Sequence, residues 1–315
     1  MTKIIHKKIL SKQIVITENN AGQRIDNFLM RFIGKIPNSR IYQMLRKGEV
    51  RVNGGRIKQN YKLKNNDAVR IPPVYLFEKQ ILQPNQAIQK KILQSIIFED
   101  EGLVAINKPP GIVVHAGSRQ SYGVIEIFRA IGGDYRTLEL AHRLDKDTSG
   151  CLILAKNIPT LRALQKNLQD KKNIKTYTAL LSGRMKKKKN IVTNPIRKNI
   201  KSSGEHMVTI DEKGKAASTI FFREHLYNDS TLAKIELITG RTHQIRVHSA
   251  FMGNFVIGDK KYGDKTVNHK YRQLGLKRMF LHSKSLNFFS PVTKKRIIIE
   301  AKLEKNLVDF LDKLH

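Results

Sequence analysis

From Ser95 onward the chain is divided into short apolar runs, and this pattern limits the possible folds more than any other feature. Short runs rich in β-branched and aromatic residues, bounded by turn residues, are typical of strands. Their sequences are SIIFED, LVAINK, LELAH, CLILAK, TYTALLSG, STIFF, LAKIELI and RIIIEAKL. Helical spacing occurs between some of them, as at Leu161, Leu164 and Leu168. The expected fold class is therefore α+β, with a strand-rich mixed α/β domain in the larger part of the chain.

The N-terminal part predicts a smaller module of two helices and a hairpin. Apolar residues recur at helical spacing in two stretches, 25–33 and 41–45. Ser39 is the expected N-cap of the second helix, and Gly48 is placed to end it. The Asn-Gly pair in EVRVNG, after alternating valines, predicts a tight hairpin turn.

The two parts predict separate domains. The chain has 315 residues, about twice the usual length of a single domain. We expect an N-terminal extension at 1–20, the small domain at 21–80, and the large domain at 95–315. Residues 81–94 contain a proline and no sustained apolar period, so they are expected to be a linker.

The charge of the chain predicts a polyanionic partner. Lys and Arg number 59 against 26 for Asp and Glu, a net charge of +33. No stretch approaches the roughly 20 apolar residues that span a bilayer, and the basic N-terminus is interrupted by Lys and Gln before a signal peptide could form. We expect a cytoplasmic protein. Its single cysteine excludes an internal disulfide framework and a thiolate metal cluster within one chain.

Basic residues gather on the second helix and the hairpin of the small domain. They are Arg40, Arg46, Lys47, Arg51, Arg56 and Lys58. Taken alone, such a cluster fits a solvated face as well as a nucleic-acid site. The stretch AGQRIDNFL...IPNSRIYQMLRKGEVRVNGGRIK, however, resembles the S4 RNA-binding domain over its whole length. The resemblance implies RNA as the partner. A second basic tract, RMKKKKN, is interpreted as a solvated loop rather than a site, with RNA contact as the alternative.

The segment AHRLDKDTSG packs five ionisable side chains into ten positions just before an apolar run. Alone, it fits an ordinary charged turn. Three other segments, INKPPGIVVHAG, KTYTALLSG and LITGRTHQIRVH, occur with it in a fixed order along the chain. Together the four segments resemble the RluA family of pseudouridine synthases, and with the S4 module the resemblance covers nearly the whole chain.

The resemblance implies an isomerase that converts uridine to pseudouridine in large-subunit (23S) ribosomal RNA without a cofactor. Asp145 matches the catalytic aspartate of the family, and Asp147 is interpreted as structural or capping. Burial would favour a neutral carboxyl group, and a nearby guanidinium opposes that effect; Arg246 matches the arginine that pairs with the aspartate. Tyr177 matches the active-site tyrosine, which can stack on the base and take part in proton transfer. The carboxylate could attack the sugar, attack the ring or remove a sugar proton.

Two further arginines are predicted to contact RNA. Arg143 resembles the residue that enters the RNA when the target base leaves its stack, and Arg241 is expected at a phosphate. His142, His243 and His248 match no zinc spacing, so we interpret them as core or RNA-facing residues and expect no metal. The protein is expected to be monomeric.

Two other functions fit parts of the sequence. One is a non-catalytic RNA-binding assembly factor that uses only the S4 module; it would not need Asp145, Tyr177 and Arg246 all intact. The other is a paralogous synthase with different ribosomal or transfer RNA targets, which the sequence does not exclude.

Overall fold

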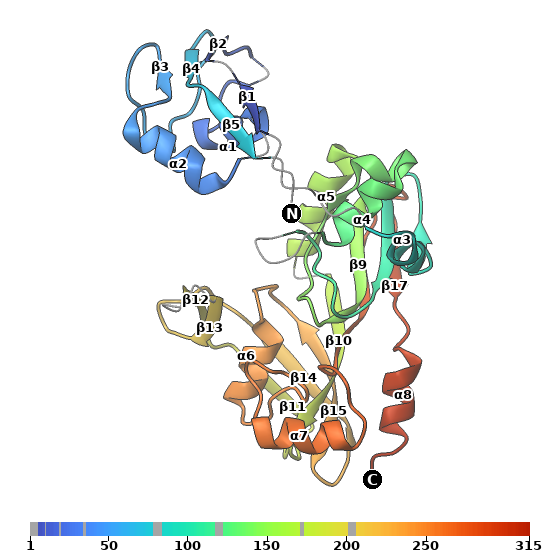
Figure 1. The fold of residues 1–315 in the computed structure, drawn as a ribbon. Coiled ribbons are helices and arrows are strands. Elements are labelled where there is room, and N and C mark those ends of the chain that lie inside the picture. Colours follow the sequence, from blue (N-terminus) through green and yellow to red (C-terminus); the bar gives the residue numbers. More distant parts are fainter. Residues whose placement is uncertain are drawn as a thin grey trace. The chain divides into compact units, whose positions relative to one another are not determined.

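The computed structural model describes residues 6–9, 11–18, 20–33, 36–77, 84–116, 122–170, 173–200 and 206–315. The chain forms two compact units, Met1–Leu82 and Gln83–His315 (Figure 1). Each unit has its own apolar core, and each is described separately below.

The first unit contains the two predicted helices, α1 (Ile25–Ile33) and α2 (Asn38–Lys47). Their apolar faces meet in a core that includes Leu29, Ile41 and Met44. Helix α2 ends at Gly48, which has a φ of 70°, as the sequence predicts for a left-handed C-cap. The N-cap prediction was wrong: Ser39 lies inside the helix, and Pro37 takes the N-cap position without a side-chain hydrogen bond.

Short strands complete the first unit. β1 (His6–Ile9) pairs with β5 (Val74–Phe77), and a second sheet has the order β2 (Lys12–Val15), β4 (Ala68–Ile71), β3 (Arg51–Val52). The predicted hairpin turn is present: Asn53 and Gly54 both have positive φ. Residues 12–15, which were predicted to belong to an N-terminal extension, instead form β2 and pair antiparallel with β4.

The second unit is built on one ten-stranded sheet. The path is β11 (Lys189–Val192), β14 (Thr219–Leu226), β15 (Ser230–Leu237), β10 (Ile174–Ser182), β16 (Leu281–Phe289), β9 (Ser149–Ala155), β7 (Leu103–Lys108) and β6 (Ile96–Glu99). β17 (Arg296–Glu300) pairs with β16, and β8 (Glu139–Leu140) pairs with β9. A strand lies in each of the eight predicted runs, which confirms the α+β class.

Helices and a hairpin surround this sheet (Figure 1). They are α3 (Gln86–Leu93), α4 (Val124–Ile131), the short 3-10 helix Gly133–Thr137, α5 (Ile158–Gln169), α6 (Gln244–Phe251), α7 (Lys265–Gln273), α8 (Lys305–Leu311), and the β12 (Ile196–Ile200) to β13 (His206–Ile210) hairpin. The linker prediction for residues 81–94 differs from the structure, since 86–93 form α3. Asn85 caps this helix and Ile92 is fully buried, so tertiary packing stabilises it where no period was evident.

One strand pairing brings the site residues together. β9 runs parallel to β16, with Gly150 opposite Ser283, and Tyr177 of β10 lies on the other side of Ser283. Gly150 has a φ of 106°, and a Cβ atom there would lie 2.2 Å from the Ser283 carbonyl oxygen. Only glycine fits this approach. The end of the 141–148 loop is therefore fixed two strands away from Tyr177.

Candidate active site

A small pocket lies beside the sheet where the 141–148 loop, β10 and α6 meet. It encloses about 60 Å³. Its lining comprises Arg143, Leu144, Asp145, Thr148, Tyr177, Leu237, Arg241, His243, Gln244, Ile245, Arg246 and Leu281. All five site residues predicted in the large domain are in this list. Four segments that are distant in the sequence thus contribute to one concave site.

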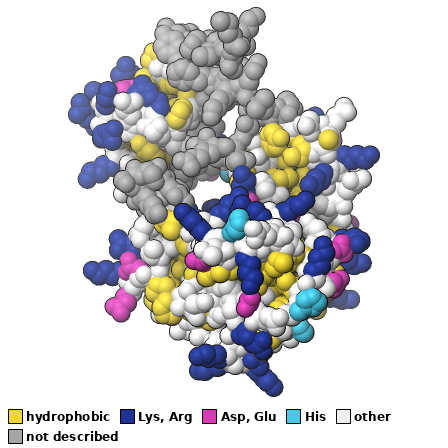
Figure 2. Space-filling view, turned by 60° about the horizontal axis from the view of Figure 1, so that its bottom comes forward, with side chains coloured by type: hydrophobic (Ala, Val, Ile, Leu, Met, Phe, Trp, Pro, Cys, Tyr) yellow, Lys and Arg dark blue, Asp and Glu magenta, His cyan; other side chains and the backbone are white. Residues whose placement is uncertain are grey.

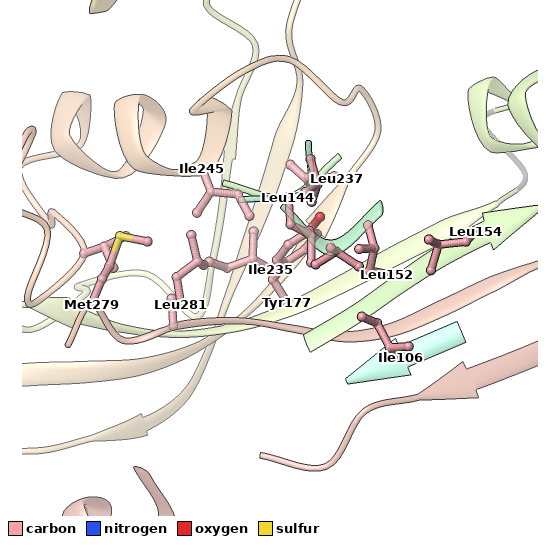
Figure 3. Close-up of a cluster of buried hydrophobic side chains, with 14 of the residues drawn as sticks. Ile106, Leu144, Leu152, Leu154, Tyr177, Ile235, Leu237, Ile245, Met279 and Leu281 are labelled. Carbon is pink, nitrogen blue, oxygen red and sulfur yellow. The ribbon is translucent and has the colours of Figure 1, made fainter. Parts of the chain in front are cut away.

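Asp145 presents its carboxylate to this pocket from the loop between β8 and β9. Arg246 donates a hydrogen bond from Nη1 to Asp145 Oδ2 at 2.9 Å. Leu144, the preceding residue, is buried in the apolar core and anchors the loop (Figure 3). The neighbouring acid, Asp147, is exposed and does not line the pocket. The structure therefore singles out Asp145 from the two carboxylates of the motif.

Arg246 is held by a second carboxylate. Its Nε and Nη2 donate to the two oxygens of Asp259 at 2.7 and 2.8 Å, a two-pronged arrangement that fixes the guanidinium plane. The guanidinium also lies over the ring of Tyr262, 5.0 Å from its centroid. Burial alone would raise the pKa of the Asp259 carboxyl, but the hydrogen bonds and charge of Arg246 lower it overall. Asp259, with a side chain 1% exposed, therefore acts as a charged clamp on Arg246.

Tyr177 lies within a cluster of buried apolar side chains, with Leu144, Leu152 and Leu237 among its members (Figure 3). Burial raises the pKa of the Tyr177 phenol to about 12, and the nearby charge of Asp145 acts in the same direction. The phenol is therefore neutral at physiological pH. A neutral phenol can donate or accept a proton, and its ring offers an apolar face to a planar base.

The loop that carries Asp145 is contacted by two basic side chains, Lys108 and Arg278. Lys108 is fully buried and donates from Nζ to the carbonyl oxygens of Pro109, Ile112 and Lys146. Burial lowers its pKa to about 7. Arg278 donates to the Ser149 hydroxyl at 2.7 Å, at the other end of the loop. These contacts hold the chain at Lys146 and Ser149, just after Asp145.

The two predicted RNA-contacting arginines lie at the rim of the pocket. Arg143 and Arg241 are both exposed and both line it. Arg241 is partly ordered, since its Nε donates to the Ala216 carbonyl at 3.2 Å. Their charges are available to an RNA strand that approaches the opening.

The three histidines have separate environments. His142 accepts a hydrogen bond at Nε2 from the Ile153 backbone, and burial lowers its pKa to about 3. His248 is fully buried, and its ring nitrogens contact Thr219 and Asn194. Only His243 of the three lines the pocket. Among the described residues, no group of three His, Cys, Asp or Glu side chains is arranged to hold a metal ion.

The basic residues predicted to bind RNA in the first unit differ in their exposure and in their contacts within the protein. Arg40 forms an ion pair with Glu49 at 2.7 Å, and Arg51 donates to the carbonyl oxygens of Gly48 and Gly54. Arg46 and Lys47 are exposed in the last turn of α2. Arg56 is also exposed, and its side chain packs along Gly48. Figure 2 shows basic side chains outnumbering acidic ones on the visible face.

Several residues around the site were not singled out from the sequence. Asp259 and Tyr262 lie in GDKKYG, which has no periodicity and looks like an exposed turn. Lys108 ends a predicted strand, where a lysine is normally solvated. Their roles become visible only through burial and through partners far away in the sequence.

Two family models match the chain. Residues 102–251 match the RNA pseudouridylate synthase model, and residues 23–69 match the S4 domain model. Curated relatives include the ribosomal large subunit pseudouridine synthase C of Pasteurella multocida, 46% identical over 99% of this chain and 96% of that protein. The protein of the same name from Escherichia coli K12 is 43% identical over 96% of each chain.

Solved structures share the fold. Human RNA Pseudouridylate Synthase Domain Containing 4 has a TM-score of 0.59 and 24% identity, covering 73% of this chain and 97% of that one. Human RNA Pseudouridylate Synthase Domain Containing 1 has a TM-score of 0.56 and 22% identity, covering 66% and 83%. In the described part of the chain, no helix is long and apolar enough to cross a membrane.

Proposed function

The chain belongs to the RNA pseudouridylate synthase family, and from this premise we propose that it isomerises uridines in large-subunit ribosomal RNA, with Asp145, Tyr177 and Arg246 as the catalytic set. The observation that carries the site assignment is the Asp145–Arg246 ion pair at 2.9 Å in a pocket that Tyr177 also lines. The choice of RNA is supported by the names of relatives that match almost end to end. We expect such an enzyme in the cytoplasm, as a monomer.

The reaction breaks the bond between N1 of uracil and the ribose, turns the base, and joins C5 to the same ribose carbon. The proton lost from C5 is balanced by the proton gained at N1. Among the described residues that line the pocket, Asp145 is the only carboxylate, so the nucleophile or base is assigned to it. Arg246 orients that carboxylate through the hydrogen bond from its Nη1 to Asp145 Oδ2. Tyr177 provides a face for the freed uracil, which must stay in the site while it turns.

The approach of the RNA is assigned to the exposed cations. A base inside folded RNA has to leave its stack before it reaches Asp145. We assign Arg143, two residues before Asp145, to fill the resulting gap, and Arg241 to contact a phosphate. In the first unit we assign RNA binding to Arg40, Arg46, Lys47, Arg51 and Arg56, of which Arg46, Lys47 and Arg56 are exposed.

The substrate is tested by mapping pseudouridines in all cellular RNA with and without the gene. We expect specific pseudouridines to disappear from large-subunit ribosomal RNA and to return when the wild-type gene is restored. Loss confined to transfer RNA or small-subunit RNA would overturn the substrate assignment and identify a paralogous synthase. A gene encoding Asp145→Asn should not restore the modification.

Replacing Tyr177 with Phe is expected to lower kcat by about 10²-fold or more, the usual contribution of a group that transfers protons. RNA affinity should stay close to wild type, because the ring that contacts the base is retained. The measurement is single-turnover kinetics together with a binding titration. A kcat near wild type would leave Tyr177 with a stacking role only and would move proton transfer to another group.

Removing the two exposed positive charges at the end of α2 is expected to change the salt dependence of RNA binding. Each phosphate contact contributes a slope of about −0.7 on single strands, so Arg46→Ala with Lys47→Ala should make the slope shallower by about 1.4. The control is Lys302→Ala with Lys313→Ala, two exposed lysines of the second unit outside the pocket lining. Equal slopes for the α2 variant and the wild type would show that these two residues do not contact RNA.

A further inference from the structure

His243 and Asp145 face each other across a gap in the pocket. His243 Nε2 lies 3.8 Å from Asp145 Oδ2, too far for a direct hydrogen bond. A separation of this size is wide enough for one oxygen atom to contact both groups from the side. The nature of that oxygen depends on which groups donate and which accept.

The proton on His243 is assigned by its neighbours. The Tyr262 hydroxyl accepts a hydrogen bond from the Val208 backbone N–H at 3.0 Å and lies 2.7 Å from His243 Nδ1. The phenol still has its own O–H to donate, and we take His243 Nδ1 as the acceptor of that hydrogen bond. Burial lowers the pKa of His243, which leaves the ring neutral at physiological pH. In a neutral ring with Nδ1 accepting, Nε2 carries the hydrogen and points it into the pocket.

The position of His243 is fixed by its backbone and by its surroundings. It is the N-cap of α6 and adopts the left-handed conformation, with a φ of 56° that few residues with side chains adopt. Its ring packs edge-on against Tyr262, with centroids 5.4 Å apart. Tyr262 is bound in turn to β13, in the hairpin that lies beside α6 (Figure 1). A costly backbone conformation held by packing on both sides is common at functional sites.

The two facing groups are complementary to a hydroxyl. Nε2–H is a donor, and the Asp145 carboxylate is an acceptor. A carbonyl oxygen could accept from His243, but it would be repelled by the lone pairs of the carboxylate. An amino group could donate to Asp145, but its other hydrogens would face the N–H donor of His243. A hydroxyl accepts from one group and donates to the other. In the interior of an RNA chain the 3′ and 5′ oxygens are esterified to phosphate, so the 2′-hydroxyl is the one hydroxyl of the nucleotide.

We propose that His243 Nε2 and Asp145 Oδ2 together bind the 2′-hydroxyl of the target nucleotide, so that His243 makes the enzyme select a ribonucleotide at that position. This inference rests on the proposed placement of the target ribose at Asp145. Tyr262 is a positioning residue, because its hydroxyl fixes the hydrogen of His243 on the nitrogen that faces the pocket. Recognition of the 2′-hydroxyl is the general means by which a protein distinguishes RNA from DNA.

The test uses two short RNA hairpins with the same large-subunit sequence, one with uridine and one with 2′-deoxyuridine at the target position. Discrimination is the ratio of kcat/KM for the two substrates. For the wild type we expect a ratio of about tenfold or more, the loss caused by leaving polar groups without a partner. His243→Ala should slow the uridine substrate and leave the deoxyuridine substrate nearly unchanged, so the ratio falls toward one.

Three further variants complete the test. His243→Gln keeps a side-chain N–H donor and should retain part of the discrimination. Tyr262→Phe removes the hydroxyl that fixes which ring nitrogen of His243 carries the hydrogen. It should therefore reduce the ratio, but by less than His243→Ala does. His225→Ala, an exposed histidine of β14 outside the pocket lining, should leave the ratio at the wild-type value. Circular dichroism checks the fold of each variant, and if His243→Ala fails to fold, His243→Gln and Tyr262→Phe decide the question.

The proposal is overturned if the wild type does not discriminate, or if a folded His243→Ala slows both substrates equally and keeps the wild-type ratio. An equal loss would mean that His243 only supports the pocket. Failure of the proposed active site has a different signature, since Asp145→Asn would then retain turnover on the uridine substrate. The two failures are therefore read from different variants.

Discussion

Asp145→Asn is expected to fold and to bind RNA like the wild type while forming product at least about 10³-fold more slowly, since a deleted nucleophile or base costs this much or more. The substitution keeps the size and shape of the side chain. It removes the negative charge that faces Arg246 Nη1 at 2.9 Å and replaces it with an amide that can neither attack the sugar or ring nor take a proton. Because Arg246 keeps its two bonds to Asp259, the structural cost should be small.

The measurement is single-turnover pseudouridine formation in an assay sensitive to about 10³-fold loss, with RNA binding measured in parallel. Asp147→Asn is the matched control, because Asp147 belongs to the same loop but is exposed and outside the pocket lining. It should retain close to full activity. Turnover by Asp145→Asn within tenfold of wild type, or a comparable loss in Asp147→Asn, would disprove the assignment of Asp145.

Arg246→Lys is expected to lower kcat by about 10²-fold, the effect of a small misplacement of a catalytic group. Lysine keeps the positive charge but cannot contact Asp145 and both oxygens of Asp259 at once. Asp145 would then lose its fixed orientation. Asp259, whose side chain is 1% exposed, would lose a buried hydrogen bond, so the free energy of unfolding should fall by about 1–3 kcal/mol.

Kinetics and denaturant unfolding of the same preparation measure the two effects. Arg272→Lys, an exposed arginine on α7, is the control and should change neither kcat nor stability. A wild-type kcat for Arg246→Lys would mean that charge alone is needed beside Asp145. The clamp by Asp259 would then have a structural role only.

The sequence predicted those elements whose local pattern agrees with their tertiary environment. LVAINK became β7 (Leu103–Lys108), and the spacing of Leu161, Leu164 and Leu168 became α5. β16 (Leu281–Phe289) was missed because its sequence, LHSKSLNFF, carries several polar residues in an inner strand. His282, for example, is accommodated there by contacts with the Ser149 hydroxyl and the Ala301 carbonyl. Such contacts leave no local pattern.

The candidate site was predictable in its motif residues and not in their supports. Asp145, Tyr177 and Arg246 were named from their segments, and the structure places all three at one pocket. Asp259 and Tyr262 act on Arg246 and His243 through contacts that no spacing rule encodes. His243 was considered only as one of three histidines. Its importance depends on a left-handed backbone and a tyrosine nineteen positions later, and both become visible only in the folded chain.

The parallel pairing of β9 with β16 also means that the pocket cannot be assembled until β16 has been synthesised. Ser149 and His282, joined through their side chains, are 133 positions apart. The basic first unit, by contrast, is complete once residue 82 has been made, and N-terminal domains generally fold while synthesis continues. Each nascent molecule therefore completes its S4 unit before it can hold Asp145 beside Tyr177. A product that terminates before β16 would keep that unit without a pocket, and would compete with the full-length enzyme for RNA that it cannot modify.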